Sequence, residues 1–357
     1  MTLTVAFAPL PELGALAPRW QALEARSDRS SFFLGWTWIE SWLSTSGAAP
    51  ELLTVQSHGI DVALALIGRA MVPRRLGPVA TLALNQSGIA AHDRGFIEYN
   101  GLLKAADAPD GVEATAMTAL EGRNDWRALQ LAGVSSGSQL AGYGRFRRRI
   151  RADVSPAYFV DLAAVRAASG DYLSLLSANS RSQIKRSIKD HGAAVAICIA
   201  STVEAAEAWL AEMQELNAGR HADNAWDDAG FRAFARALTL RGLETGEVEL
   251  LRVTAGDHLL GYLLNFIYGG HAMNYQSAFT APISGKAKPG LMCHAAAVGR
   301  YADAGLMLYS LLAGKDRYKQ SLATGQEELE WWTLERFSLR LEAEAFLRKI
   351  LRRPASA

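Results

Sequence analysis

The residues at 286–290 have the types and spacing of an anion-binding helix start. Lys286 and Lys288 come just before Pro289-Gly290, and proline is well tolerated in the first turn of a helix. The first backbone N–H groups of a helix lack partners within it, and the helix dipole favours negative charge there. The segment therefore predicts a cradle for a phosphate group. A surface turn with two solvated lysines fits the same residues.

Other kinds of site find little support in the sequence. The two cysteines, Cys198 and Cys293, lie far apart, which excludes a disulfide scaffold and a zinc site built on Cys-x-x-Cys. Seven histidines show no His-x-x-x-His spacing, so no metal is expected. The Gly-x-Ser-x-Gly pattern at 133–137 lacks a clear following helix and a matching downstream histidine, and we interpret it as a loop.

The second half of the chain shows a specific order of elements. Ser177 or Asn179 can cap a basic helix over 180–189 that ends near Gly192. Further predicted strands lie at 194–199, 247–253, 259–267, 272–279, 307–311 and 328–334, and helices at 203–218, 228–240, 289–303, 315–322 and 336–353. Three successive antiparallel strands thus lead into a helix, a strand and a second helix.

The sequence of the first half predicts a similar mixture of strands and helices. Helical spacing begins at Pro11 and continues in the aromatic segment 32–43, with another short helix near 137–143. Strand patterns occur at 2–8, 51–56, 62–70, 126–133, 147–154 and 158–162. Since Ala, Ser and Gly dominate 162–171, we expect an α+β protein with domains at 1–165 and 166–357, each a mixed, mostly antiparallel sheet flanked by helices.

Composition limits the class of protein. The 37 Lys and Arg nearly balance the 36 Asp and Glu of this 357-residue chain, so no nucleic-acid partner is expected. No segment approaches the roughly 18 apolar residues of a membrane span, and residues 1–20 lack the basic start of a signal peptide. We therefore expect a cytoplasmic protein.

Two basic segments leave a peripheral membrane role open. The amphipathic helix predicted at 336–353 could lie on the anionic inner face of a membrane, or it could pack on its own domain with a solvated basic face. Five arginines at 145–151 could serve a phosphate, a tRNA or a lipid head group, or line a solvated strand edge.

A set of motifs gives residues 179–335 a resemblance to a known family. These are Asn179-x-Arg181, Leu216-Asn217-x-x-Arg220, Pro289-Gly290-Leu291-Met292 and Gly314-Lys315-Asp316-Arg317-Tyr318-Lys319. In this order they resemble the GNAT-type acyltransferase domain of the cellulose-biosynthesis-associated (CelD/BcsL-like) acetyltransferase group, which is related to FemAB peptidyltransferases and bacterial ceramide synthase. The aromatic segment 33–38 resembles the opening of that family, though the first half matches more loosely.

The resemblance implies two GNAT-like (acyl-CoA N-acyltransferase) domains, of which 166–357 is catalytic. It implies acyl transfer from acyl-CoA, as co-substrate, to an amine such as a long-chain lipid amine, or to an envelope polysaccharide. The alternatives are FemAB-type transfer from aminoacyl-tRNA and a non-catalytic GNAT-fold binding module. Met292 stands where the usual phosphate signature has Gly or Ala, which leaves room for an unusual donor.

The resemblance also implies roles for particular residues. Donor contacts would come from Lys286, Lys288, Gly290, Leu291 and Met292, and oxyanion donors from the backbone near Gln276 and Ser277. Tyr318 would protonate the leaving thiolate, Asp316 and Lys319 would orient its helix or touch substrate, and Asn217, Arg220 and Tyr275 would bind the acceptor. His294 and His221 are the candidate general bases, since the strand at 272–279 contains no carboxylate. Alternatively, Tyr318 is a packed ring without a catalytic role, Asp316 and Lys319 form a surface ion pair, and the two histidines are structural.

Overall fold

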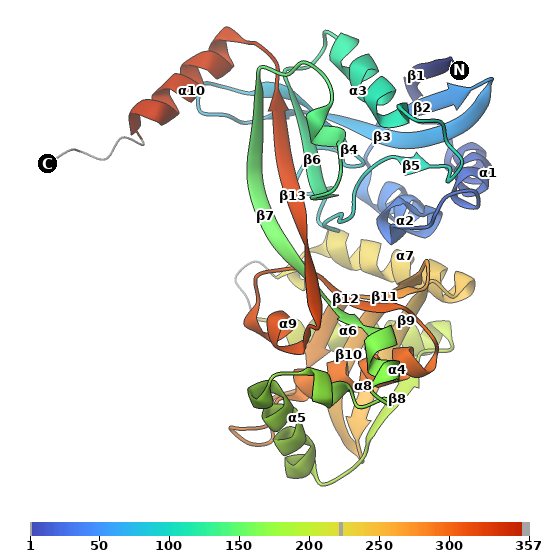
Figure 1. The fold of residues 1–357 in the computed structure, drawn as a ribbon, viewed down its shortest axis with the longest axis vertical. Helices are drawn as coiled ribbons and strands as arrows, with labels where there is room; N and C mark the ends of the chain where they lie inside the picture. Colours follow the sequence, from blue (N-terminus) through green and yellow to red (C-terminus); the bar gives the residue numbers. More distant parts are fainter. Residues whose placement is uncertain (1, 221–223, 352–357) are drawn as a thin grey trace, which may run out of the picture.

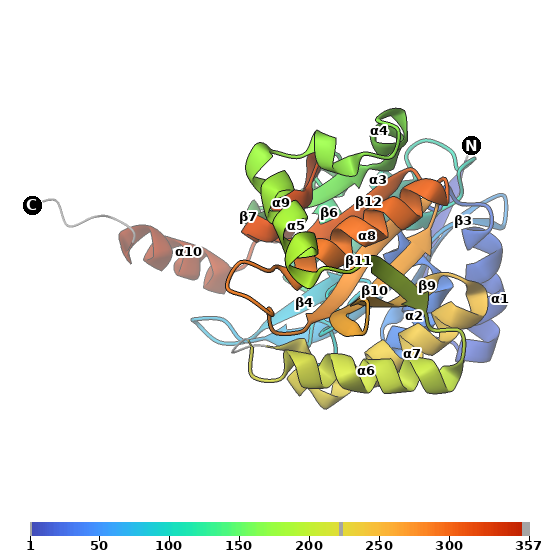
Figure 2. The same ribbon diagram turned by 90° about the horizontal axis from the view of Figure 1, so that it is seen from below.

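One twisted sheet runs through the length of the molecule (Figure 1). The computed structural model describes residues 2–220 and 224–351. The sheet has 13 strands in the order β1-β2-β3-β4-β6-β13-β7-β12-β11-β10-β9-β8, and the short β5 pairs with β3. Most neighbours are antiparallel, and helices lie on the faces of the sheet (Figures 1 and 2). The protein is therefore α+β, as the sequence predicts.

The N-terminal half contains three elements that the sequence analysis does not predict, β4, β5 and α3. Its elements are β1 (Leu3–Pro9), α1 (Leu13–Glu24), η1 (Phe32–Leu34), α2 (Trp36–Ser46), β2 (Glu51–Ser57), β3 (Ile60–Val72), β4 (Val79–Leu84), β5 (Leu103–Lys104), α3 (Val112–Gly122), β6 (Ala128–Ser135), η2 (Leu140–Gly142) and β7 (Arg148–Asp161). The two strands predicted at 147–154 and 158–162 are the single strand β7. It continues through Pro156, which lies opposite Glu328 of β13 and accepts a hydrogen bond from the Gly314 N–H (3.0 Å).

The C-terminal half follows the predicted order closely. Its elements are α4 (Leu162–Ala167), η3 (Tyr172–Leu175), α5 (Ala178–His191), β8 (Val195–Ile199), α6 (Val203–Asn217), η4 (Ala225–Asp227), α7 (Ala229–Thr245), β9 (Val248–Ala255), β10 (His258–Tyr268), β11 (His271–Phe279), α8 (Pro289–Asp303), β12 (Leu308–Ala313), α9 (Arg317–Leu322), β13 (Gly325–Glu335) and α10 (Leu339–Leu351).

Local signals set the ends of the helices that surround the later site. Ser177 Oγ accepts from the Ser180 N–H (3.2 Å) at the start of α5, and Gly192 ends that helix with φ of 65°. Asp228 Oδ1 caps α7 through the Phe231 N–H (2.8 Å), and α8 begins at Pro289. The predicted caps at Ser177 and Gly192 are thus confirmed.

The two halves repeat one pattern of strands. In the first, β1 to β4 are antiparallel and β4 runs parallel to β6; in the second, β8 to β11 are antiparallel and β11 runs parallel to β12. Each parallel contact is limited to a short stretch, 81–83 with 128–130 and 271–273 with 308–310. Beyond it the two strands separate in both halves.

The halves exchange strands where they meet. β13 comes late in the chain but pairs with β6 of the first half through residues 329–335. β7 comes from the first half but pairs with β12 of the second through residues 157–161. β7 and β13 also pair with each other along 148–159 and 325–335 and form the long central ribbon of Figure 1. The boundary near residue 165 stays a prediction, because strands from both sides of it share one sheet.

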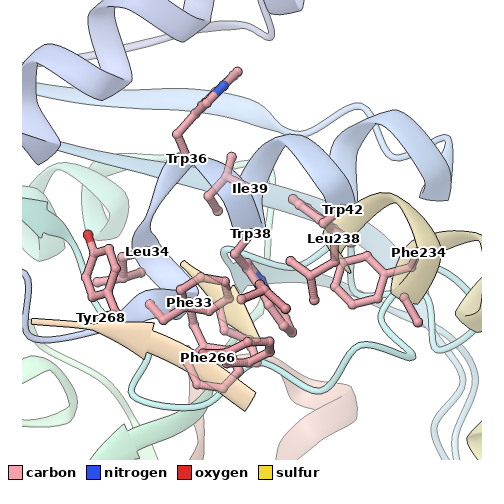
Figure 3. Close-up of a cluster of buried hydrophobic side chains, with 14 of the residues drawn as sticks. Phe33, Leu34, Trp36, Trp38, Ile39, Trp42, Phe234, Leu238, Phe266 and Tyr268 are labelled. Carbon is pink, nitrogen blue, oxygen red and sulfur yellow. The ribbon is translucent and has the colours of Figure 1, made fainter. Parts of the chain in front are cut away.

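An aromatic cluster also joins the halves. Phe266 of β10 stacks on Phe32 of η1 with ring centroids 4.0 Å apart, and it meets Phe33 and Trp38 edge-on at 5.9 and 6.1 Å. Figure 3 shows the rings of Phe33, Trp38 and Phe266 converging from η1, α2 and β10. Offset and edge-to-face pairs add to the free energy gained by burying the rings. The aromatic segment recognised in the sequence therefore supplies the contact between the halves.

Replacing Phe266 with Ala should lower the free energy of unfolding by about 3–5 kcal/mol, because the deletion leaves a cavity in this shared cluster. Chemical denaturation of the full chain measures the change. Phe337→Ala is the matched control: that ring is 63% exposed, so we expect a change below about 0.5 kcal/mol. Two unfolding transitions, of which only one shifts in the Phe266 variant, would contradict a core shared by both halves.

Candidate active site

The edge of β11 that faces β12 is open beyond its first three residues. Pairing between the two parallel strands involves His271–Met273 on β11 and Leu308–Ser310 on β12 only. β11 meanwhile stays paired with β10 as far as Phe279. The two strands therefore diverge, and the divergence leaves backbone groups on one edge of β11 without a strand partner.

Ser277 and Phe279 direct their backbone groups to that open edge. The Ser277 carbonyl accepts from Asn217 Nδ2 (3.2 Å), and the Phe279 carbonyl accepts a short hydrogen bond from the Arg220 guanidinium. In an antiparallel strand, the N–H and C=O of one residue point to the same side. The N–H groups of Ser277 and Phe279 therefore face the opening, where they can donate to a carbonyl or an oxyanion.

The residues predicted to bind the acceptor hold β11 in place. Asn217 and Arg220, at and after the end of α6, tie that helix to the outer carbonyls of the strand. Tyr275 is bound through its hydroxyl, which donates to the Gly95 carbonyl (2.8 Å), and burial raises its pKa well above the ordinary value. The Gln276 side chain accepts from Trp226 Nε1 (3.1 Å).

A carboxylate from the N-terminal half lies at the β12 side of the opening. Glu98 Oε2 accepts a hydrogen bond from the Ala313 N–H at 2.8 Å. Burial raises the pKa of Glu98 to about 7, although that hydrogen bond and the Lys319 charge oppose the rise. A carboxylate with such a pKa can take up and release a proton near neutral pH. The sequence analysis does not single out Glu98.

A kink in β12 creates this contact. Leu312 has a φ of +58°, in the left-handed region that a branched side chain rarely adopts. The Ser310 hydroxyl accepts from the Leu312 N–H (3.1 Å), and the register of β12 against β7 shifts between Ser310 and Ala313. The kink turns the Ala313 N–H toward Glu98.

The predicted motif at 314–319 also contacts Ala313. Lys319 Nζ donates to the Ala313 carbonyl (2.7 Å), and burial lowers the pKa of the Lys319 ammonium. A Cβ at Gly314 would lie 2.8 Å from that Nζ, so glycine is needed for the close approach. Asp316 precedes α9 and favours the charged form of Lys319. The Glu98 carboxylate and the Lys319 ammonium thus bind the N–H and the carbonyl of one residue, Ala313.

His294 and Tyr318 form a second group beside the site. Their rings are stacked with centroids 5.9 Å apart, and His294 Nδ1 lies 2.9 Å from the Tyr309 hydroxyl. Burial lowers the pKa of His294 to about 3, while burial and Asp316 raise that of Tyr318 to about 12. A histidine with this pKa is neutral and a weak base at pH 7, so the pKa shifts favour Glu98 over His294 as the general base. His221 lies outside the described residues.

The start of α8 packs on β11 and is preceded by two exposed lysines. A Cβ at Gly290 would lie 2.9 Å from the Phe279 ring, so the glycine allows the helix to pack on β11. Leu291 and Met292 are buried in the core beneath it. Lys286 and Lys288 are exposed, and these two side chains with the helix start remain the predicted phosphate cradle.

The corresponding opening in the N-terminal half is filled by the chain itself. Asn85 Nδ2 donates to Asn100 Oδ1 (2.8 Å) and to the Gly101 carbonyl (2.7 Å), and Asn100 Nδ2 donates to the Leu84 carbonyl (2.9 Å). The Asn100 N–H also donates to the Gly133 carbonyl of β6 (3.1 Å). The segment 85–101 therefore occupies the space between β4 and β6, and this anchoring presents Glu98 to the other half.

A cavity of about 700 Å³ lies between the halves next to the site. Its wall includes Tyr99, which follows Glu98, and Ser310, which precedes the kink of β12. Hydroxyl, amide and charged side chains contribute much of the rest, among them Arg29, Ser30, Asn100, Lys104, Ser135, Gln139 and Glu327.

The sequence contained only a faint signal for Glu98. It is a single carboxylate between aromatic and aliphatic neighbours, in the segment Phe96-Ile97-Glu98-Tyr99, and it lies 215 residues before its partner Ala313. Within residues 2–220 and 224–351, no cluster of His, Cys, Asp and Glu could hold a metal ion. The same part of the chain contains no helix with the length and apolarity that a membrane span requires.

Comparisons with known proteins agree with this fold. FemX superposes with a TM-score of 0.58 and 10% sequence identity, over 97% of this chain and 100% of that one. The DUF2156 C-terminal domain of a proposed lysylphosphatidylglycerol synthetase from Agrobacterium fabrum has a TM-score of 0.57 and 12% identity, over 95% of this chain and 97% of that one. L-PGS from Bacillus licheniformis has a TM-score of 0.52 and 10% identity, over 94% of this chain and 97% of that one. At these identities the likeness concerns the fold. A search of curated protein sequences gave no significant match.

A family model matches the part of the chain that carries the open edge, the α8 start and the 314–319 motif. The model describes an acetyltransferase (GNAT) domain and covers residues 178–320. This match and the superpositions confirm the predicted fold class of GNAT-like units. Residues 178–320 of this protein are therefore similar in sequence to an acetyltransferase (GNAT) domain.

Proposed function

We propose that the protein transfers an acyl group from acyl-CoA to an amine, with Glu98 as the general base. The observation that carries the proposal is the position of the Glu98 carboxylate, which accepts a hydrogen bond from the Ala313 N–H (2.8 Å) beside the open edge of β11. Burial, which raises the pKa of this carboxyl to about 7, supports the same role. The GNAT domain match supports an acyltransferase. CoA as the donor and an amine as the acceptor are our own inferences.

The side chains around the opening can serve each step of such a transfer. The amine nitrogen forms a bond to the thioester carbon while Glu98 takes the amine proton. The N–H groups of Ser277 and Phe279 donate to the oxyanion, and the Lys319 charge stabilises it at longer range. The C–S bond then breaks, and Tyr318 gives its hydroxyl proton to the leaving thiolate. Tyr318 is 38% exposed, so bulk water can return that proton.

The cavity between the halves favours a polar acceptor. The hydroxyl, amide and charged groups of its wall could hydrogen-bond a sugar or a peptide. Of the acceptors implied by the resemblance, we therefore favour the amine of an envelope saccharide over a long-chain lipid amine. The entrance for this acceptor would pass Tyr99 and Ser310.

Transfer from aminoacyl-tRNA, as in the FemAB peptidyltransferases, is the second candidate. The similarity of fold to FemX over 97% of this chain favours it. Against it stands a net charge of +1, which provides little attraction for a polyanion. A GNAT-fold binding module without catalysis would bind a ligand but release no thiol.

Donor binding distinguishes these candidates. CoA, acetyl-CoA and palmitoyl-CoA should each raise the melting temperature, because a ligand bound only by the folded state stabilises it by about 2.7 kcal/mol at a concentration of 100 Kd. Pantetheine, which lacks the phosphates, should give a smaller rise. Differential scanning fluorimetry of the full chain measures both.

The cradle at α8 can be tested in the same assay. Lys286→Gln/Lys288→Gln should reduce the CoA-induced rise without changing the melting temperature of the free protein, since both side chains are exposed. Lys349→Gln, an exposed lysine of α10 outside the cradle and the cavity, is the control and should respond to CoA as the natural chain does. A rise with aminoacyl-tRNA but none with the three CoA compounds would favour the FemAB-type function.

Glu98→Gln should lower the turnover of thiol release by about 10²–10⁴-fold, the usual contribution of a general base. The natural enzyme should gain activity as the pH rises through about 7, where Glu98 ionises, and the variant should lose this dependence. Thiol release with a panel of amines and amino sugars over a pH series gives both values.

The matched control is Glu207→Gln, which removes an exposed carboxylate of α6 that pairs with Arg236. It should keep both turnover and the pH profile. An unchanged pH profile in the Glu98 variant would exclude this carboxylate as the base.

The raised pKa of Glu98 also predicts a pH dependence of stability. The ordinary pKa is 4.5 and the folded value about 7, so the folded state binds more protons than the unfolded state between these values. The free energy of unfolding should therefore fall by about 1–3 kcal/mol from this group as the pH rises from 4.5 to 7. Subtracting the unfolding free energies of the Glu98→Gln variant from those of the natural chain isolates the effect. A constant difference would contradict the raised pKa.

A further inference from the structure

Helix α10 turns its apolar face away from the protein. At 100° per residue, Leu339, Phe346 and Ile350 lie on one side of the helix, and Leu341 and Glu344 on the other. The first three are 80%, 64% and 50% exposed, whereas Leu341 and Glu344 are 1% and 5% exposed. A surface helix normally buries its apolar face. This outward stripe is therefore suited to contact something apolar.

The acidic side chains of α10 are paired with arginines. Glu344 faces the body and pairs with Arg74 (3.3 Å) and with Arg348 (2.7 Å). Glu342 pairs with Arg147 (3.0 Å) and Arg148 (2.9 Å). The carboxylates of the helix are thus neutralised by the body, including the arginine cluster recognised in the sequence.

The exposed cations lie beside the apolar stripe. Arg340 and Lys349 are exposed on α10 itself. The loop between β3 and β4 packs against the start of the helix, where Arg340 Nη1 donates to the Pro78 carbonyl (2.8 Å), and it adds the exposed Arg75 and Leu76. Figures 1 and 2 both show α10 projecting from the body with this hairpin near its base.

We infer that α10 and the β3–β4 hairpin tip bind the surface of an anionic membrane. Leu339, Phe346 and Ile350 enter the acyl boundary, and Arg75, Arg340 and Lys349 contact the lipid phosphates. A second copy of the chain would bring the same cations together, and nucleic acid would leave the apolar stripe exposed to water. A lipid surface satisfies both groups at once, without depending on the acyl transfer proposed above.

The test uses the full chain with vesicles of phosphatidylglycerol and phosphatidylcholine, compared with phosphatidylcholine alone. The chain should co-sediment with the anionic vesicles and much less with the neutral ones, and added salt should weaken binding. Phe346→Ser/Ile350→Ser should reduce the affinity by about tenfold or more. Arg75→Gln/Lys349→Gln should reduce binding mainly at low salt.

Ile60→Ser/Met307→Ser is the matched control, because these side chains are similarly exposed (58% and 56%) at other places on the surface. It should bind vesicles as the natural chain does, and circular dichroism should show all variants folded. Absence of binding to anionic vesicles, or binding that survives the Phe346/Ile350 change, would overturn the inference. Sedimentation velocity could also overturn it, if the natural chain is a dimer that the Phe346/Ile350 change dissociates, since the apolar stripe would then contact a second copy.

Discussion

The pairing of β7 with β13 is the constraint on which the rest of the molecule depends. Each strand completes the sheet of the other half: β13 lies against β6, and β7 lies against β12. Two units joined only by a linker would move relative to each other, whereas a shared sheet fixes their distance and orientation. The aromatic cluster around Phe266 and Phe32 holds the same arrangement from one face of the sheet. Only this fixed relation lets a side chain from the first half reach a backbone amide in the second.

The two halves repeat one pattern but use its opening differently. In both, a parallel strand pair separates after three residues on each strand. The first half closes its opening with segment 85–101, which buried hydrogen bonds of Asn85 and Asn100 hold between the strands. The second half keeps its edge open at Ser277 and Phe279. The segment that fills the first opening also carries Glu98 to the second, so the first half positions a group for the site in the GNAT domain.

Burial moves the ionisable groups of the site toward their neutral forms. It raises the pKa of Glu98 to about 7 and lowers those of Lys319 and of His294, the latter to about 3. The common cause is the cost of holding a charge away from water. Glu98 and Lys319 retain some charge because each favours the charged form of the other. A carboxylate balanced in this way can exchange protons near neutral pH, as the general base that we propose requires.

The sequence by itself determined the features that depend on neighbours along the chain. Ser177, Gly192 and Pro289 set helix ends through local hydrogen bonds and backbone conformation, and the order of elements with the 314–319 motif indicated a GNAT domain, which the family match at 178–320 bears out. Tertiary structure alone decided the exchange of β7 and β13 and the position of Glu98. It also decided which face of α10 points outward. These features depend on contacts such as that of Glu98 with Ala313, which are 215 residues apart. No local spacing encodes such a contact, because its energy arises only when the whole sheet has formed.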